Sequence, residues 1–178
     1  IAVVKKIDPM IFITGATGMT GAHILLRLLQ SGQHVRALYR NEASTAKTLK
    51  IFRYYTPEAE ALFHRVEWHP GDVLDSYSLH TAMQGAHTVI HCSAYVSFAP
   101  RHRTMLLQTN IEGTANMVDA ALEQGVATFA HLSSIAAVGE AHTGGTASGT
   151  DMLDAPALEQ RSAYSRSKYY SELEVWRG

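Results

Sequence analysis

The amino-acid sequence predicts an α/β fold in which helices cover both faces of a parallel, doubly wound sheet. Two observations predict it. Short apolar runs alternate with helical patterns in units of about 25 to 40 residues, and the first run enters a glycine-rich loop at residues 14–21. Ligands of such sheets bind beyond the carboxyl ends of the strands. We therefore expect the functional residues to follow strand ends at Ile13, Tyr39, His69, Cys92 and Leu132.

The composition indicates one globular domain. The chain has 178 residues, of which 46% are hydrophobic and 17% charged, and its formal net charge is -1. This balance gives no basic footprint for nucleic acid or an anionic membrane, and no run reaches the ~18 apolar residues of a spanning helix. The single cysteine, Cys92, fits a reducing, cytoplasmic compartment. The histidines lack metal-ligand spacing, so no metal site is expected.

The first nine residues are expected to lie outside the fold. Met10 stands immediately before the first apolar run, so residues 1–9 are interpreted as a tag remnant or an unrelated leader. The domain is then expected to span residues 10–178.

The first half of the domain is predicted to contain four strands and the helices between them. The strands are expected at residues 10–13, 34–40, 65–69 and 87–92. The helices are expected at residues 23–30, 42–55, 57–63 and from 75 or 76 to Gly85. Asn41 and either Asp75 or Ser76 are suitable N-caps, and Pro57 suits a first helical turn. A glycine such as Gly85 terminates a helix.

The second half begins with an apolar and aromatic loop, residues 93–100, and a long helix over residues 101–124. The apolar side chains that recur at helical spacing on this helix are Leu106, Leu107, Ile111, Ala115, Val118 and Leu122. A fifth strand is expected at residues 127–132. A mobile loop over residues 140–160 and a last helix from Ser162 or Ala163 complete the prediction.

The glycine-rich loop predicts a diphosphate site. A strand, a glycine loop and a helix in succession present free backbone N–H groups and a positive helix end to an anion. Gly15 permits the tight turn, Gly18 lets the backbone approach the ligand, and Gly21 lets the helix pack closely on its strand. A glycine-rich loop can also merely turn the chain, but the flanking strand and helix favour the binding function.

Tyr164 and Lys168 are four residues apart and therefore lie on one face of the last helix. A nearby ammonium group favours the ionised form of a phenol, which makes a general acid/base for an alcohol or a carbonyl. Ser134, at the end of the fifth strand, can hold the same oxygen by a hydrogen bond. The spacing alone is a common accident of polar helices, but its position behind a phosphate loop gives it weight.

These motifs together resemble the extended short-chain dehydrogenases/reductases, which have a Rossmann fold. The resemblance runs from Met10 to the end of the chain. It implies a catalytic set of Ser134, Tyr164 and Lys168, supported by Asn110 in the Asn-x-x-Gly-Thr motif. It also implies that the cofactor contacts Gly15, Thr17, Gly18, Met19, Thr20, Gly21, Asp72, Val73, Cys92, Ser93, Ala94, Tyr164 and Lys168. Residues 35–40 and 94–98 look most like dihydroflavonol-reductase and 3β-hydroxysteroid-dehydrogenase-like members.

The end of the second strand bears on the choice of cofactor. NAD-binding proteins of this kind usually carry an acidic residue there for the ribose 2′-OH. Here Arg40 follows Tyr39, with Lys47 further along, and both are suited to a 2′-phosphate. The sequence therefore favours NADP(H). The alternative is that Arg40 stacks on the adenine and NAD also binds.

The resemblance implies an oxidoreductase that interconverts a secondary alcohol and a ketone by hydride transfer. The alternatives are a nucleotide-sugar epimerase that uses bound NAD and a non-catalytic protein that senses NAD(P). Tyr95 and Phe98 favour a moderately apolar small-molecule substrate. The resemblance further implies a homodimer, and a C-terminal substrate portion beyond the 178 residues.

Overall fold

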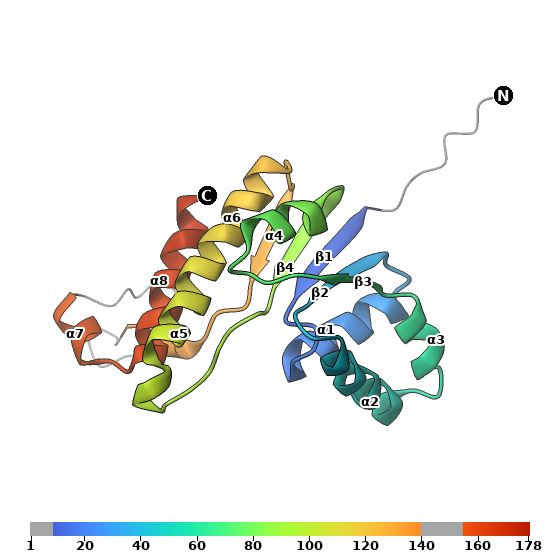
Figure 1. The fold of residues 1–178 in the computed structure, drawn as a ribbon, viewed down its shortest axis with the longest axis horizontal. Coiled ribbons are helices and arrows are strands. Elements are labelled where there is room, and N and C mark those ends of the chain that lie inside the picture. Colours follow the sequence, from blue (N-terminus) through green and yellow to red (C-terminus); the bar gives the residue numbers. More distant parts are fainter. Residues whose placement is uncertain (1–8, 140–154) are drawn as a thin grey trace.

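The computed structural model describes residues 9–139 and 155–178. Five parallel strands form one sheet in the order β3-β2-β1-β4-β5 (Figure 1). The strands are β1 Met10–Thr14, β2 Val35–Tyr39, β3 Glu67–Pro70, β4 Ala86–His91 and β5 Thr128–His131. Ile13 of β1 is in register with Ala37 on one side and Ile90 on the other. The predicted doubly wound parallel sheet is confirmed.

Helices lie on both sides of this sheet (Figure 1). One side is covered by α1 Met19–Gln30, α2 Thr45–Tyr55 and α3 Ala59–His64. The other side carries α4 Ser76–Met83, α6 Gly113–Glu123 and α8 Ala163–Arg177. The shorter elements are α5 Arg103–Leu107, α7 Ala155–Gln160, the 3-10 turns η1 Glu42–Ser44, η2 Pro100–His102 and η4 Ile135–Ala137, and the π-helix η3 Gln108–Glu112.

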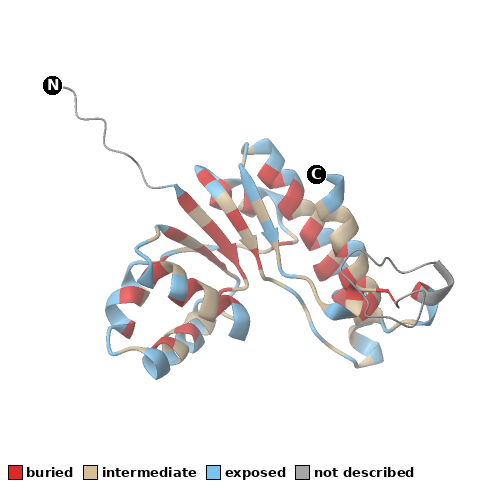
Figure 2. Ribbon diagram, turned by 180° about the vertical axis from the view of Figure 1, so that it is seen from behind, coloured by how far each residue is buried: buried red, intermediate tan, exposed pale blue. Residues whose placement is uncertain are grey.

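Side chains that alternate along the strands build a separate apolar core on each face. Phe12 and Val89 pack against α4 and α6, whereas Ile13 and Val35 pack against α1 to α3. Buried residues concentrate on the central strands, and the edge strand β5 is only half-buried (Figure 2). The sheet is therefore best protected around β1, the strand that leads into the glycine loop.

The predicted N-caps are confirmed by hydrogen bonds. Asn41 accepts from the backbone N–H of Ala43 at 2.9 Å, and Asp75, rather than Ser76, accepts from that of Tyr77 at 3.1 Å. Gly85, with φ of +76°, follows the end of α4 as expected. Pro57 was wrongly placed in a first turn, because α3 begins at Ala59 and has Glu58 as its N-cap.

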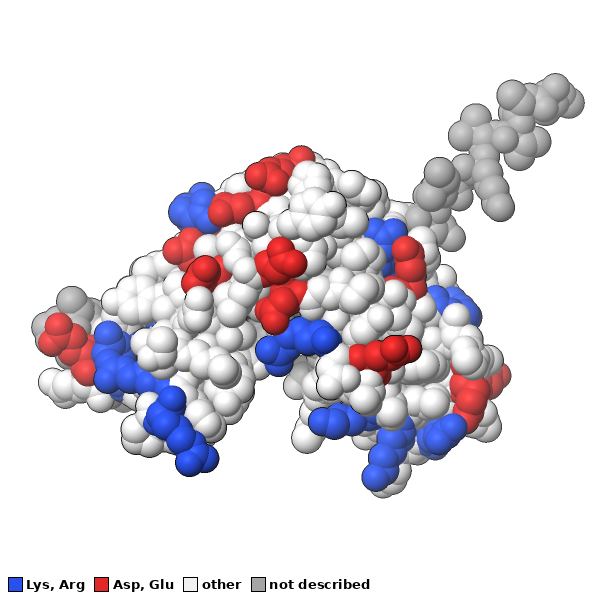
Figure 3. All heavy atoms as spheres, viewed as in Figure 1, with Lys and Arg blue, Asp and Glu red and all other residues white. Residues whose placement is uncertain are grey.

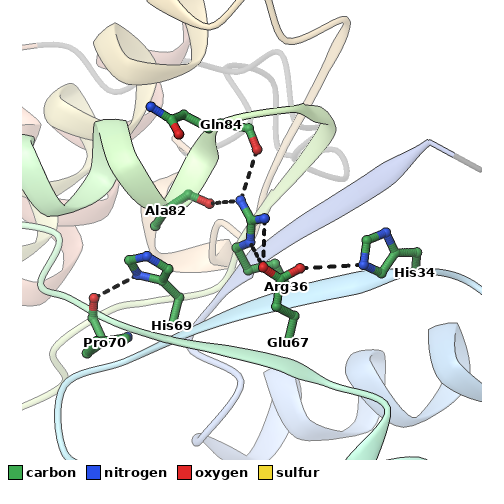
Figure 4. Close-up of polar contacts among 7 residues, drawn as sticks. All are labelled: His34, Arg36, Glu67, His69, Pro70, Ala82 and Gln84. Carbon is green, nitrogen blue, oxygen red and sulfur yellow. Dashed lines mark hydrogen bonds and ion pairs between the residues drawn. The ribbon is translucent and has the colours of Figure 1, made fainter. Parts of the chain in front are cut away.

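Arg36 joins two strands to the end of a helix (Figure 4). Its guanidinium group forms an ion pair with Glu67 at 2.7 Å and donates to the carbonyl oxygens of Ala82 at 2.7 Å and Gln84 at 2.9 Å. The last carbonyl groups of a helix lack partners within the helix, and a cation there also suits the negative helix end. Arg36 therefore holds the C-terminal end of α4 against strands β2 and β3.

The predicted long helix over residues 101–124 is confirmed in the main, because residues 103–123 are helical without a break. The sequence analysis did not anticipate that the π-helix η3 separates α5 from α6 within it. Leu122 is 57% exposed, whereas Thr109 and Asn110 are buried. Polar side chains thus replace the expected apolar stripe in the middle of this segment.

Most of the predicted loop over residues 140–160 lies outside the described residues. Its last part was predicted wrongly, because residues Ala155–Gln160 form helix α7. The predicted start of the final helix is confirmed, since Ser162 accepts a hydrogen bond from the backbone N–H of Ser165 at 3.1 Å.

Candidate functional site

The glycine loop after β1 is shaped by two close backbone approaches. A Cβ atom on Gly15, whose φ is +71°, would lie 2.6 Å from the carbonyl carbon of Cys92. A Cβ atom on Gly21 would lie 2.2 Å from the carbonyl oxygen of Gly15. Glycine is therefore required at both positions. Gly21 therefore lets α1 pack closely on the glycine loop, whereas the sequence analysis expected it to let the helix pack on its strand.

Thr48 of α2 holds the loop from outside. Its buried hydroxyl donates to the carbonyl oxygen of Ala16 at 3.0 Å. Within the loop, the N–H of Gly18 donates to the carbonyl oxygen of Gly15 at 2.9 Å. The sequence analysis missed Thr48, since no local pattern connects residues 32 positions apart.

A pocket of about 230 Å³ lies beside this loop, at the carboxyl ends of β1, β2 and β4. It is lined by Thr14, Gly15, Thr17, Gly18, Leu38, Tyr39, Arg40, Val73, Cys92, Ser93, Ala94 and Thr109. Eight of the predicted cofactor residues are among them. The others, Met19, Thr20, Gly21, Lys47, Asp72, Tyr164 and Lys168, do not line it. Thr14, Leu38, Tyr39 and Thr109 are lining residues that the sequence analysis missed. The molecular surface is hollowed between the two groups of helices (Figure 3).

Two charged residues flank this pocket at the end of β2. The guanidinium group of Arg40 is 64% exposed and lies 3.9 Å from the carboxylate of Asp72. That carboxylate also accepts from the backbone N–H of Leu74 at 3.0 Å. Such an exposed, long ion pair adds little stability, so Arg40 is available to a ligand. Lys47 is exposed on α2 and is not among the lining residues.

Tyr164 and Lys168 lie one turn apart on α8, as predicted. Tyr164 is half-buried, and its ring meets that of Phe98 at a centroid distance of 6.3 Å. Among the described residues, its hydroxyl has no hydrogen-bond partner. A phenol that is held by its ring while its hydroxyl is free is suited to exchange a proton with a bound molecule.

Lys168 is only 2% exposed. Its ammonium group donates to the carbonyl oxygen of Leu132 at 2.8 Å and to Nε2 of His131 at 3.2 Å. Burial lowers the pKa of Lys168 to about 8, although the charge of Glu172 opposes this shift. The lysine is thus a buried cation that loses its charge close to neutral pH.

His131 accepts a hydrogen bond from this lysine. Burial, and then the charge of Lys168, lower the pKa of His131 to about 4, so its ring is neutral at pH 7. Because Nε2 faces an ammonium group, the proton of the neutral ring is on Nδ1. Nδ1 is buried and has no partner within the described part of the chain. The sequence analysis did not identify this histidine.

Ser134 begins the 3-10 turn η4. Its hydroxyl oxygen accepts from the backbone N–H of Ala136 at 3.2 Å, which leaves the hydroxyl proton for another acceptor. Ser134 is not among the residues that line the pocket beside the glycine loop. The neighbouring Ser133 donates to the carboxylate of Glu172 on α8, so the chain after β5 is fastened to the helix that carries Tyr164.

Asn110 connects α8 to the loop that follows β4. Its amide oxygen accepts from the N–H of Tyr95 at 2.7 Å, and its amide nitrogen donates to the carbonyl of Tyr95 at 3.0 Å and to the hydroxyl of Ser167 at 2.9 Å. It lies in the π-helix η3, a conformation that is frequent at functional sites. Asn110 therefore positions two segments that the sequence analysis treated separately.

A second buried network fixes the end of β4. Thr114 donates to the carbonyl oxygen of Asn110 at 2.6 Å and therefore accepts from Nε2 of His91 at 3.1 Å. Nδ1 of His91 in turn accepts from the hydroxyl of Thr14 at 2.7 Å. Burial and the charges of His131 and Lys168 hold the pKa of His91 well below its usual range. This neutral histidine was also missed in the sequence.

The remaining features limit the chemistry. Burial raises the pKa of Cys92 to about 11, which disfavours the thiolate that a nucleophilic cysteine requires. Within residues 9–139 and 155–178, His, Cys, Asp and Glu side chains form no group that could hold a metal ion. The same residues include no helix with the length and apolar character that a membrane span requires.

Comparison with known proteins identifies the family. The profile of the NAD dependent epimerase/dehydratase family matches residues 11–177. A putative dihydroflavonol 4-reductase of Synechocystis sp. is 31% identical over 164 residues, which are 92% of this chain and 43% of that protein. Sterol demethylase protein B of Methylococcus capsulatus is 32% identical over 165 residues, 92% of this chain and 45% of that protein. The chain thus spans less than half the length of these relatives.

The fold is also shared with solved structures. The crystal structure of a short-chain dehydrogenase/reductase superfamily protein from Agrobacterium tumefaciens with bound NAD superposes with a TM-score of 0.72 at 24% identity. The match covers 93% of this chain and 44% of that one. The motifs, the fold and the family profile agree, and the chain therefore belongs to the NAD dependent epimerase/dehydratase family of extended short-chain dehydrogenases/reductases.

Proposed function

We propose that this chain is the cofactor-binding part of an NADP(H)-dependent oxidoreductase that interconverts a secondary alcohol and a ketone. One observation carries the proposal: the buried Lys168 lies one helical turn from Tyr164, whose hydroxyl has no partner among the described residues. A phenol with a free hydroxyl can give a proton to a substrate oxygen and take it back.

We propose that the cofactor binds in the pocket beside the glycine loop, since Gly15 and Gly18 carry no side chains that would cover their backbone beside the N-terminus of α1. When bound, the nicotinamide supplies or accepts the hydride. Tyr164 donates the proton to the ketone oxygen, or takes it from the alcohol in the reverse direction. Ser134 donates its free hydroxyl proton to the same oxygen and stabilises the developing charge.

Arg40 favours NADP(H) over NAD. Its exposed guanidinium group lines the pocket at the end of β2, where a ribose 2′-phosphate would give it a stronger partner than the distant Asp72. We propose that Lys47 contributes to cofactor binding only by long-range electrostatic attraction, since it is not among the residues that line this pocket.

The proposal is tested on the whole protein by titrating NADPH and NADH separately and then following nicotinamide absorbance with a panel of ketones. We expect tighter binding of NADPH and stoichiometric oxidation of NADPH with at least one ketone. Binding without oxidation for every ketone of the panel, in either direction, would contradict the proposal.

An epimerase is the second candidate, favoured by the family profile and by structures such as a UDP-glucuronic acid 4-epimerase from Bacillus cereus. An epimerase keeps NAD bound and returns the hydride to its own substrate. Purified protein that carries NAD and shows no net nicotinamide turnover would favour it. A non-catalytic sensor needs neither the free phenol nor the buried lysine, so we rank it third.

We also propose a cytoplasmic homodimer, as the family resemblance implies. Leu122 at the end of α6 is 57% exposed and Trp176 at the end of α8 is 81% exposed. Burial of both side chains against a second copy would remove apolar surface from water. Light scattering of the whole protein gives the mass that decides between monomer and dimer.

A further inference from the structure

A second pocket, of about 380 Å³, lies beside Tyr164. It is formed by the loop after β4, the start of α5, the end of α7 and the N-terminus of α8. Its lining residues are Ser97, Phe98, Ala99, Pro100, Arg103, Glu159, Arg161, Ser162, Ala163, Tyr164 and Arg166. Among the described residues, it shares no lining residue with the pocket beside the glycine loop. Tyr164 lines this second pocket, so a molecule bound here would lie beside the acid/base tyrosine.

The lining residues that the structure describes carry a net positive charge. Among them are three arginines and one carboxylate, that of Glu159. Basic side chains lie at the end of the molecule that carries α5 and α7, with acidic side chains beside them (Figure 3). The N-terminus of α8, a helix of 15 residues, opens into the pocket through Ser162 and Ala163 and adds its positive end.

The guanidinium groups of two of the arginines have no hydrogen-bond or ion-pair partner among the described residues. Nε of Arg166 is buried and has no hydrogen-bond partner in the described part of the chain. Arg103 is exposed, and none of the described residues forms a hydrogen bond or ion pair with its side chain. A buried donor without a partner costs free energy, and an anion that reaches it would remove that cost. Arg161, by contrast, has another interaction and is left out of the argument.

We propose that the substrate carries an anionic group, a carboxylate or a phosphate, which Arg103 and Arg166 bind while its ketone or alcohol carbon lies at Tyr164. The inference rests on the proposed function and adds the substrate class to it. Phe98, Ala99 and Pro100 line the same pocket and provide an apolar wall for the carbon skeleton. The Phe98 ring, 6.3 Å from that of Tyr164, places this wall next to the reacting group.

The test uses three ketones with one aromatic skeleton: 4-acetylbenzoate, 4-acetylphenyl phosphate and the neutral methyl ester of 4-acetylbenzoate. Calorimetry measures the dissociation constant of each from the whole protein saturated with NADP⁺, so that binding is measured without turnover. Arg166→Gln and Arg103→Gln remove the two proposed contacts. Arg101→Gln is the matched control, since Arg101 lies two residues from Arg103 and outside the pocket.

We expect one or both anions to bind at least about tenfold more tightly than the ester, the factor that one charge-assisted hydrogen bond gives. This preference falls toward unity in Arg166→Gln and Arg103→Gln and is kept in Arg101→Gln. The carboxylate and phosphate arms decide which anion fits. Equal affinities for all three ketones, or a preference that both pocket variants keep, would overturn the proposal. Failure of every ketone to be reduced, with the anion preference intact, would instead contradict the oxidoreductase function alone.

Discussion

Helices α1 and α8 lie on opposite sides of the same sheet and bury opposite kinds of side chain. The buried residues of α1 are Gly21, Ala22, Leu25, Leu26 and Leu29. Those of α8 are Ser165, Ser167, Lys168 and Ser171. Helix α1 thus follows the ordinary amphipathic pattern, whereas α8 places hydroxyl groups and a cation in the interior.

The two helices bury different side chains because they hold different parts of the structure in place. The buried side of α1 packs on the sheet and the glycine loop through apolar contacts. Each buried polar group of α8 requires a partner, because an unpaired one is costly. Ser171 donates to the carbonyl oxygen of Asn110, and Lys168 donates to that of Leu132. We call α8 and the buried groups that bond to it the polar side of the molecule, and α1 with its apolar contacts the apolar side. The polar side is positioned by specific hydrogen bonds, so its stability depends more on pH than that of the apolar side.

Replacement of Leu25 by alanine tests how much the apolar contacts of α1 stabilise the fold. Leu25 is fully buried against the sheet, so the cavity and the lost apolar contact should reduce the free energy of unfolding by about 2–5 kcal/mol. Urea denaturation measures it. Met105→Ala is the control, since its side chain is 56% exposed and the expected loss is below about 0.5 kcal/mol. Equal losses for Leu25 and Met105 would contradict the burial assignment.

The dependence of unfolding free energy on pH tests the polar side. His91 and His131 are held neutral in the folded state, because their pKa values are lowered. The unfolded chain binds protons below pH 6.5 while the folded chain does not, so stability falls as pH decreases from about 6.5 toward 4. The limit is about 1.4 kcal/mol per pH unit for each histidine. Denaturation at pH 7 and pH 5 measures the loss, and His131→Asn should reduce this slope. An unchanged slope in that variant would show that His131 titrates normally.

Asn110→Ala tests the connection between the two segments of the polar side. The substitution leaves the N–H of Tyr95 and the hydroxyl of Ser167 without their partner, at an expected cost of about 1–3 kcal/mol in unfolding free energy. Asn116→Ala provides a matched comparison on the next turns of the same segment, because Asn116 makes a single bond, to the carbonyl oxygen of Val73 at 3.0 Å. A larger cost for Asn116 would contradict the role given to Asn110.

Arg40→Ala measures the smallest effect, on cofactor choice. Loss of a charge-assisted contact to the 2′-phosphate should weaken NADPH about tenfold, with little change in NADH affinity. Lys47→Ala should change either affinity less than twofold, since Lys47 does not line the pocket. Fluorescence titration of the reduced cofactors gives all four constants. Equal weakening of both cofactors by Arg40→Ala would favour stacking on the adenine instead.

The parts of the fold that depend on local pattern could be predicted from the sequence. The strand before the glycine loop, the caps at Asn41 and Asp75 and the i, i+4 pair on α8 each follow from residues near one another in the chain. These local features were consequently predicted almost correctly on both sides of the sheet, including the need for glycine at Gly15.

The polar side could not be predicted in the same way. Thr14 and His91 bond across 77 residues, and His131 meets Lys168 across 37, so no local periodicity records either pair. The π turn around Asn110 left no signal in the helical spacing, and the sequence analysis wrongly expected Leu122 to face the interior. Buried serines on α8 look like a solvated helix in the sequence, because their partners lie on distant segments.

The central claim is that α8 presents an acid/base tyrosine, and Tyr164→Phe tests it most directly. The whole protein and the variant are compared for ketone reduction and for NADPH affinity, with Tyr169→Phe on the same helix as control. We predict that Tyr164→Phe lowers kcat by roughly 10²–10⁴, the usual contribution of general acid catalysis, while NADPH affinity stays unchanged. Turnover that is undiminished in Tyr164→Phe would contradict the account.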